Sequence, residues 1–413
     1  MRAASARHSA GRPRAGSRGW VLLTGVVVLL CMSAATVATA AVPGHGALVG
    51  SRHLSVTGHA RSSVKFPIVG LVDKGTQAPY THREPWPTAT PDEVAPDAGA
   101  FSGFVVNETW AQLEPTQRRF TFAPLQRSLA AVQVYNHAHP RSQLAVKLRL
   151  WGGFTAPEWA KTLGDTTPVT FATPTASGTT GRWWAPAYQA AWSTFQHRLA
   201  AKFDDNPVIR TVSVSSCATL TDEPFVFSPE TALHNELFAD GWTSAAQQRC
   251  LQGAFSDYSG WKHTPIEYTF NPYVSYTPDT TAGTADPTFT DEMMTRCADL
   301  RQTAGRSCIL SNHALDSTVA TSSRSAPVYA EIDNLHAAHP GSTPADFQTF
   351  SPDTFGGCEA INVAILHHGQ SVELWPPGPI VHGFPIFGGF STFPESELAQ
   401  WAHALKRHAP LSC

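Results

Sequence analysis

The chain has 413 residues, of which 42% are hydrophobic and 15% are charged, and it contains 12 Trp and 22 Phe. That composition supplies enough apolar material for a large core and too little charge for a disordered chain, so it predicts a folded globular protein. The length suits two or three domains of ordinary size, although a single α/β barrel can account for most of it.

The first 40 residues differ from the rest. They contain five arginines and no acid, followed by an apolar run over residues 20–32 and by Ala38-Thr39-Ala40, which fits a small-x-small cleavage pattern. We therefore expect residues 1–40 to be a signal peptide and the protein to be secreted. A permanent transmembrane anchor is the alternative, but the apolar run is short for a span of about 20 residues.

Residues 41–64 are rich in Gly, Ser, His and Ala without a period, which predicts a flexible linker. Once the leader is removed, the net charge is about −8. No Lys/Arg-rich run remains in the mature part, so the sequence argues against nucleic acid as a partner and against binding to a membrane surface.

Six cysteines follow the leader, and an even number in an exported protein favours disulfides. Many pairings are possible, but proximity suggests Cys297 with Cys308, and Cys358 with Cys413 would hold the C-terminus. None of the cysteines has Cys-x-x-Cys or Cys/His ligand spacing, so we expect no zinc site, no other metal and no cofactor. The six are Cys217, Cys250, Cys297, Cys308, Cys358 and Cys413.

Short β-branched runs alternate with helical patterns from residue 66 onward. This alternation predicts a parallel sheet, and eight units predict a single (β/α)8 TIM barrel over residues 66–408. A doubly wound open sheet is the alternative, but Asp73-Lys74-Gly75-Thr76 is not a glycine-rich phosphate turn. The expected strands are Phe66–Asp73, Phe101–Trp110, Leu144–Trp151, Ile209–Ser216, Ile266–Phe270, Ile309–Asn312, Asp346–Phe350 and Ser371–Trp375. The expected helices are Ala123–Tyr135, Ala187–Phe203, Ser244–Tyr258, Thr290–Thr303, Pro327–Ala338, Cys358–His368 and Pro394–His408.

Barrel enzymes carry their chemistry on the loops that follow each strand. At the predicted strand ends this sequence places carboxylates, amides and tryptophans, a mixture that suits a carbohydrate because indoles stack on sugar rings and a carboxyl pair can cleave the glycosidic bond. We expect Glu223 and Glu373 to be catalytic. The expected substrate-binding residues are Asp73, Trp110, Arg149, Trp151, Asn312, Gln348 and Trp375.

Three motifs carry a family resemblance. Trp110-Ala111-Gln112-Leu113-Glu114-Pro115 resembles the element after the second strand of β-galactosidase-like glycoside hydrolases of clan A, and Ala156-Pro157-Glu158-Trp159 is similar to their third-strand loop. Asp222-Glu223-Pro224 resembles their Asn-Glu-Pro signature, with Asp222 where that family has Asn. The resemblance implies a TIM barrel and makes Glu223 the general acid/base.

The resemblance also implies a nucleophile at the end of strand seven, where this sequence offers Gln348. Glu373 comes on the next strand, so either the strand count is one too high or the second carboxylate has moved. If Glu373 is not the second group, Asp73, Glu108 and Asp316 are the candidates to consider.

The sequence therefore predicts a secreted glycoside hydrolase that acts on an oligo- or polysaccharide through two carboxylates. A catalytically degenerate carbohydrate-binding or cell-wall-associated barrel is the alternative from another class. A barrel hydrolase acting on another polymer is a second alternative, without a serine nucleophile because G-x-S-x-G does not occur.

Overall fold

The computed structural model describes residues 64–75, 99–172, 177–219, 221–225, 231–321, 324–341, 343–350, 356–375 and 389–413. The chain divides into residues 1–59 and 60–413, and all described residues belong to the second unit. The predicted signal peptide and nearly all of the predicted linker lie outside the described residues. No helix within the described part is long and apolar enough to cross a membrane.

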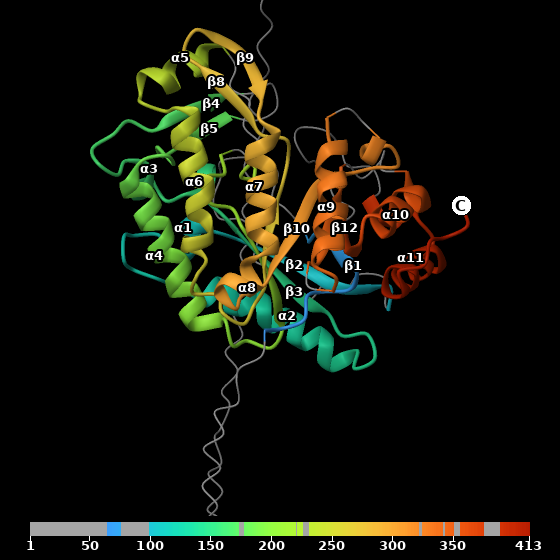
Figure 1. Cartoon of the computed structure of the whole chain (residues 1–413). Helices are drawn as coiled ribbons and strands as arrows, with labels where there is room; N and C mark the ends of the chain where they lie inside the picture. Colours follow the sequence, from blue (N-terminus) through green and yellow to red (C-terminus); the bar gives the residue numbers. More distant parts are fainter. Residues whose placement is uncertain are drawn as a thin grey trace, which may run out of the picture. The chain divides into compact units, whose positions relative to one another are not determined.

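Eight parallel strands form a closed barrel in the order β1-β12-β11-β10-β7-β6-β3-β2 (Figure 1). This confirms the predicted (β/α)8 TIM barrel, and each barrel strand coincides with one predicted strand. The strands are β1 (Gly70–Asp73), β2 (Phe101–Thr109), β3 (Ala145–Trp151), β6 (Ile209–Ser213), β7 (Ile266–Thr269), β10 (Cys308–Leu315), β11 (Ala345–Thr349) and β12 (Gly369–Leu374).

Two antiparallel pairs, β4 (Val169–Ala172) with β5 (Ser177–Thr180) and β8 (Val274–Thr277) with β9 (Thr280–Ala285), follow barrel strands β3 and β7 and were not predicted.

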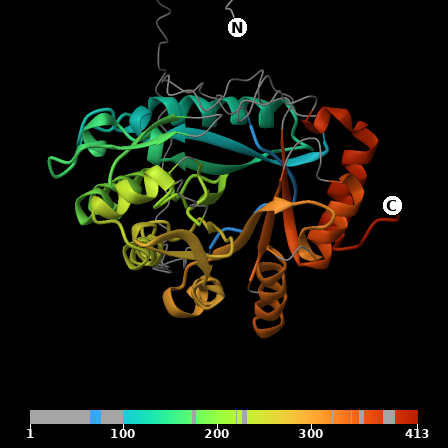
Figure 2. The same ribbon diagram turned by 90° about the horizontal axis from the view of Figure 1, so that it is seen from above.

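Helices lie around the outside of the strands (Figure 2). The longest, α4 (Pro186–Phe203), buries Tyr188, Trp192, Phe195, Leu199 and Phe203, which fall on one helical stripe. The other helices are α1 (Trp110–Leu113), α2 (Ala123–Ala138), α3 (Glu158–Lys161), α5 (Thr231–Ala239), α6 (Ser244–Asp257), α7 (Pro287–Ala298), α8 (Leu300–Ala304), α9 (Ala326–Ala338), α10 (Gly357–Leu366) and α11 (Glu395–Arg407), with short 3-10 turns at Gly153–Thr155, Val319–Thr321 and Gly389–Thr392.

One predicted helix, Thr290–Thr303, is in fact two helices, α7 and α8. The first begins three residues early because Asp286 caps it, its side chain accepting from the amide of Phe289, and Pro287 occupies the first turn. Capping by Asp with a following Pro is a start signal readable in the sequence.

Alternation along β3 sorts its side chains between two environments. Val146, Leu148 and Leu150 belong to the hydrophobic core beneath the helices. Lys147 and Arg149 have the opposite parity, and Lys147 reaches carboxylates on β7, β11 and β12, which places it inside the barrel. On β3, the face toward the barrel interior is thus charged, whereas the face toward the helices is apolar.

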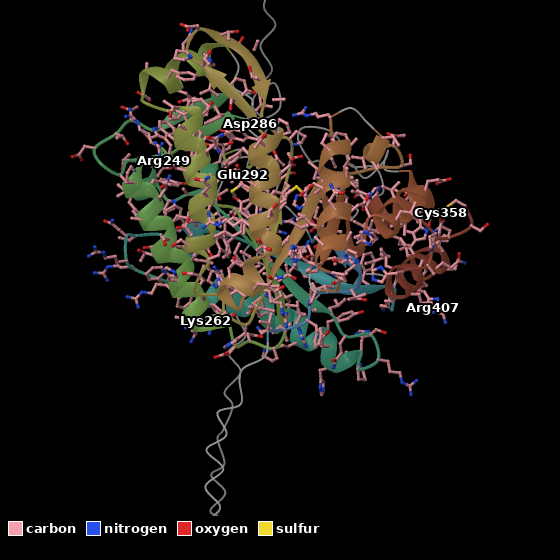
Figure 3. The ribbon with its side chains drawn as sticks, viewed as in Figure 1. Arg249, Lys262, Asp286, Glu292, Cys358 and Arg407 are labelled. Carbon is pink, nitrogen blue, oxygen red and sulfur yellow. A yellow bond between two sulfur atoms is a disulfide. The ribbon has the colours of Figure 1, made fainter. Side chains whose placement is uncertain are left out.

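Charged side chains on the helices have a different environment. Arg249 on α6, Glu292 on α7 and Arg407 on α11 are all exposed (Figure 3). The buried charges inside the barrel are therefore a separate set that the fold has to neutralise by pairing, because a buried unpaired charge is costly.

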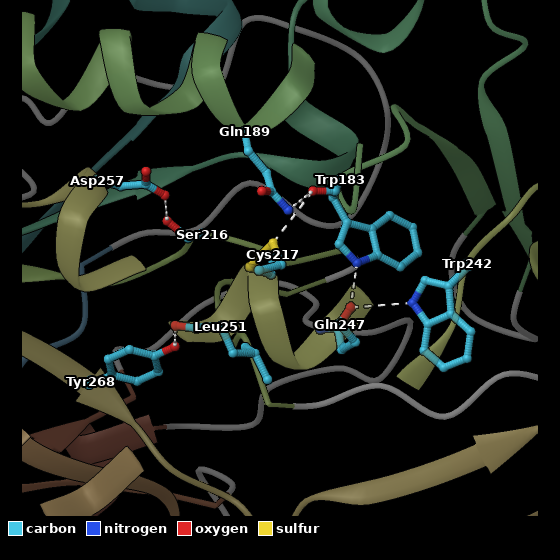
Figure 4. The surroundings of a disulfide bond; sticks show 10 residues. Trp183, Gln189, Ser216, Cys217, Trp242, Gln247, Leu251, Asp257 and Tyr268 are labelled. Atoms are coloured by element: carbon cyan, nitrogen blue, oxygen red, sulfur yellow. Dashed lines mark hydrogen bonds between the residues drawn. A yellow bond between two sulfur atoms is a disulfide. The ribbon is translucent and has the colours of Figure 1, made fainter. Parts of the chain in front are cut away.

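Three disulfides form, and they include the two suggested pairings, Cys297–Cys308 and Cys358–Cys413. The third, Cys217–Cys250, joins the segment that leaves β6 to α6. Around it, the Gln247 side-chain oxygen accepts hydrogen bonds from Trp183 and Trp242 (Figure 4). This disulfide anchors the segment just before Asp222 and Glu223.

Candidate active site

The centre of the barrel holds an interior charge cluster, which we define as Lys147, Arg149, Glu267, Asp346 and Glu373. The Lys147 ammonium lies 3.1 Å from Glu267 Oε1, 2.5 Å from Asp346 Oδ2 and 3.1 Å from Glu373 Oε2. Glu267 also accepts from the hydroxyls of Ser213 and Ser311. One ammonium therefore neutralises carboxylates from three strands.

Charge pairing sets the protonation states of this cluster. Burial alone lowers the pKa of Lys147, but Asp346, Glu267 and Glu373 outweigh it and hold that pKa above the usual range. Burial likewise raises the pKa of Glu373, and the cations Arg149, Lys147 and Lys74 reverse the shift and hold it well below the usual range. Glu373 is therefore ionised at neutral pH.

Arg149 connects this cluster to the loop that carries Glu223. Its two terminal nitrogens donate to the two oxygens of Glu373 at 2.9 and 2.8 Å, and its Nε lies 2.7 Å from Asp222 Oδ2. A guanidinium presents this fork geometry to carboxylates from two directions. Asp222 and Glu373 are thereby held by one side chain, with Glu223 next to Asp222 in the chain.

Glu223 is the part of this arrangement that reaches solvent, with its side chain 19% exposed. Asn271, just after β7, donates to Glu223 Oε2 at 3.0 Å, and His313 Nδ1 lies 3.4 Å from Oε1. The carboxyl group is thus held from two strands while one side stays accessible.

His313 on β10 links Glu223 to the interior charge cluster. Its Nε2 lies 3.3 Å from Glu267 Oε1 and 3.1 Å from the Thr269 hydroxyl. Burial lowers the pKa of His313, but Glu223 and Glu267 outweigh it and raise the pKa to about 9. Burial raises the pKa of Glu223, and His313, Lys74 and Asn271 bring it below the usual value. In the free site the imidazolium holds the proton and Glu223 is a carboxylate.

Two tryptophans lie above the charge cluster. Trp151 Nε1 donates to Asn107 Oδ1 at 3.0 Å, and Trp375 Nε1 donates to the carbonyl of Thr349 at 2.8 Å. Trp375 is 7% exposed, and the Lys74 ammonium lies 3.7 Å from the centre of its ring. These polar anchors fix both indoles at the carboxyl ends of their strands.

The strand count resolves where Gln348 and Glu373 lie. Gln348 is on β11, the seventh barrel strand, and pairs in register with Glu373 on β12, the eighth. Gln348 is 4% exposed, and its side-chain oxygen has no hydrogen-bond partner among the described residues. The eight-strand count was right, and Glu373 is the in-register neighbour of Gln348 on the following strand.

Three of the predicted substrate-binding residues, Trp110, Asn312 and Asp73, do not point into the barrel. Trp110 has no exposed surface, packs edge-on against Trp159 and Trp192, and donates to Glu114, so its faces are covered by core aromatics. Asn312 has the opposite parity to His313, and its amide pairs with the carbonyl of Phe270 and the hydroxyl of Tyr329 on α9. We correct both expectations, since neither side chain can reach a ligand at the barrel mouth.

Asp73 is also placed differently from the prediction. It precedes Lys74 at the end of β1, is 3% exposed, and its carboxylate accepts from the amide of Gly75 at 2.9 Å. This is the loop-capping role of an Asx turn. Asp316 similarly accepts from the amide and hydroxyl of Thr318, in an exposed turn.

Glu108, an alternative second carboxylate, faces away from the barrel interior. It is fully buried between β2 and α2, where Ser128 donates to one oxygen and the other has no described partner. Burial raises the pKa of Glu108 from 4.5 to about 7, more than Ser128 and Arg127 lower it. Glu108 is thus a structural group rather than a catalytic one.

The raised pKa of Glu108 predicts that the free energy of unfolding depends on pH. Because the folded-state pKa is raised, the unfolded chain loses its proton first, and stability falls as the pH rises from about 4.5 to about 7, by up to about 3 kcal/mol. Glu108→Gln removes the titration, so its unfolding free energy relative to the wild type should increase by about 1 to 3 kcal/mol between pH 5 and pH 8. Unfolding in guanidinium at both pH values measures this free-energy difference, and Glu158→Gln, at an exposed position, is the control. A difference between Glu108→Gln and the wild type that is the same at pH 5 and pH 8 would contradict the prediction.

Sequence reasoning missed Lys74, Lys147, Glu267 and Asp346 and left His313 undecided between core residue and ligand. The signal was present in β3, where Lys147 and Arg149 alternate with apolar residues and must share one face. Within the described residues no group of three or more His, Cys, Asp or Glu has the geometry of a metal site.

No protein-family profile and no curated protein matches the chain. Among solved structures it is similar to endo-glycoceramidase II from Rhodococcus sp., with 14% identity over 82% of this chain and 80% of that one and a TM-score of 0.46. It is also similar to an endo-beta-1,4-glucanase from Xanthomonas axonopodis pv. citri, with 12% identity over 83% and 100% and a TM-score of 0.43. An endogalactoceramidase matches with 16% identity over 75% and 71% and a TM-score of 0.40. The barrel assignment rests on the strand order of this chain, and the β-galactosidase-like resemblance stays a prediction.

Proposed function

We propose that this protein is an extracellular glycoside hydrolase whose reaction depends on Glu223, with Glu373 as the second carboxylate. The observation that carries the proposal is the Arg149 bridge. One guanidinium binds both oxygens of Glu373 and also Asp222, the residue before the partly exposed Glu223. Cleavage of a glycosidic bond requires two carboxyl groups that flank it, and the Arg149 bridge ties the segment that carries Glu223 to Glu373.

The charge states suggest how the roles divide. Glu373 stays ionised because Arg149 and Lys147 lower its pKa, which suits a nucleophile or base. Glu223 has to protonate the leaving oxygen, and His313 holds a proton 3.4 Å away in the free site. A bound substrate excludes water from Glu223 and so favours its neutral form, which lets the proton pass from the imidazolium to the carboxylate.

Three further residues would contact the substrate. Trp151 and Trp375 are indoles suited to stack on a sugar ring, and Gln348 offers an unpartnered oxygen to a sugar hydroxyl. Arg149 acts through Asp222 and Glu373, because those carboxylates engage its guanidinium. The three disulfides suit an extracellular location.

The test is secreted protein assayed against a panel of plant and microbial oligo- and polysaccharides, with release of reducing ends as the readout. We expect cleavage of at least one glycan. Absence of cleavage throughout the panel, together with binding of none of its members, would overturn a carbohydrate function altogether.

A second candidate is a carbohydrate-binding barrel without catalysis. Two observations favour it: Glu373 has no exposed surface, and Gln348 rather than a carboxylate occupies the end of β11. This candidate predicts that the protein binds a glycan from the panel without cleaving it, whereas the hydrolase releases reducing ends from the glycan it binds.

A further inference from the structure

Lys74 lies at the barrel mouth and has no role in the reaction described above. Its backbone is fixed on both sides, because its amide donates to the carbonyl of Leu374 at 3.0 Å and its carbonyl accepts from the Asn107 side chain at 3.2 Å. The residue is 3% exposed, and its ammonium lies over the ring of Trp375. A rigid strand end thus delivers a buried cation beside a predicted sugar platform.

The other cations inside the barrel have carboxylate partners within ion-pair distance. Lys147 has three, Arg149 has two and His313 has two. Within the part of the chain that the structure describes, Lys74 makes no such pair with any carboxylate, and its ammonium lies against the face of Trp375. Burying an ammonium without an anionic partner is costly, and a cation–π contact offsets only part of that cost.

Burial lowers the pKa of Lys74 to about 8, although Glu373, Asp222 and Glu223 act in the opposite direction from a greater distance. A group with this pKa is still mostly protonated at neutral pH. Each of those carboxylates already has a closer cation, Arg149 for Glu373 and Asp222, and His313 for Glu223. A ligand that brings its own negative charge would therefore find Lys74 available.

We propose that the sugar bound at the barrel mouth carries a carboxylate, as in a uronic acid residue, and that Lys74 binds this group. The inference rests on the proposed carbohydrate function and narrows its substrate to acidic glycans. The Lys74 ammonium covers one face of the Trp375 ring, so a sugar would lie beside the ammonium rather than on that face. A carboxylate joined directly to a pyranose ring lies at the ring's edge, where it can meet the ammonium. The pair would be well shielded from solvent, where a charge-assisted hydrogen bond is strong.

The test compares glucuronic and galacturonic acid with glucose and galactose, as free sugars and as p-nitrophenyl glycosides. Binding is followed by NMR titration and cleavage by nitrophenol release, using the wild type, Lys74→Met and Lys74→Arg. We expect the wild type to prefer the uronic sugars, and Lys74→Met to lose about 10- to 100-fold of their affinity with little change for neutral sugars. Lys74→Arg should retain part of the preference because it keeps the charge.

Lys65→Met is a matched control. Lys65 is also a partly buried lysine with a pKa lowered by burial, but it donates to the carbonyls of Asn206 and Ile209, at the start of β6 and so at the other end of the barrel. Its loss should leave the preference for uronic sugars unchanged. Thermal unfolding of each variant confirms that it is folded.

Two outcomes would overturn the inference: equal binding of uronic and neutral sugars by the wild type, or an equal loss of both in Lys74→Met. The proposed function fails separately. If uronic sugars bind but are not cleaved, the hydrolase is refuted and the Lys74 site stands. If only neutral glycosides are cleaved, the Lys74 site is refuted and the hydrolase stands.

Discussion

Glu223→Gln is expected to reduce cleavage of a glycoside with a poor leaving group by at least about 10²-fold and to leave sugar binding nearly unchanged. The amide keeps the shape of the side chain and can still pair with Asn271, but it cannot give a proton to the departing oxygen. Initial rates at saturating substrate measure the chemical step, and NMR titration measures binding.

A substrate with a good leaving group needs less help from an acid, so the loss should be smaller for a nitrophenyl glycoside than for a natural glycan. Glu292→Gln, a change at an exposed carboxylate on α7, should behave as the wild type. A loss of only a few-fold on the natural glycan would show that Glu223 is not the acid.

The second carboxylate is better identified by trapping than by substitution, because Glu373→Gln would also remove one of the buried carboxylate partners of both Arg149 and Lys147. A 2-deoxy-2-fluoro glycoside slows breakdown of a covalent glycosyl-enzyme, and mass spectrometry of peptides locates the label. A label on Glu373 is expected if it is the nucleophile; a label on another carboxylate would refute that assignment.

Lys147→Met is expected to lower the free energy of unfolding by about 3 to 5 kcal/mol at pH 7. Without this ammonium, three buried carboxylates, those of Glu267, Asp346 and Glu373, lie close together. Among the described residues, Arg149 and His313 are the cations left within ion-pair distance of them. Equilibrium unfolding in guanidinium measures the change. The exposed Lys202→Met should shift it by less than about 0.5 kcal/mol.

The destabilisation caused by Lys147→Met should become smaller as the pH falls. In the wild type, Lys147 and Arg149 depress the folded-state pKa of Glu373, so the stability from this pairing is present above the unfolded pKa of about 4.3, at both pH 4.5 and pH 7. In the variant the buried carboxylates lack this cation, and they take up protons as the pH falls from 7 to 4.5, which relieves part of their repulsion. A destabilisation that is the same at pH 4.5 and at pH 7 would contradict a charge-pairing role for Lys147.

The barrel itself could be predicted from the sequence because its determinants are local. Short β-branched runs and helical stripes such as Tyr188–Phe203 specify each element, and parallel strands joined by helices leave few ways to close a sheet. The disulfide Cys297–Cys308 followed from short spacing in the same way. Glu223 could be placed near the mouth because it lies on the loop that follows the fourth barrel strand, and its catalytic role stays a prediction.

What the sequence could not decide is which way each side chain points and what it meets across the barrel. A shift of one position turns a strand residue from the interior to the helices, and this separates His313 inside from Asn312 outside, and Asn107 inside from Glu108 beneath α2. The partners of Lys147 come from positions 120 to 226 residues away in the chain. Such pairings exist only after the barrel closes, because closure alone brings distant strands within ion-pair distance, and so the charged interior was decided by the tertiary structure.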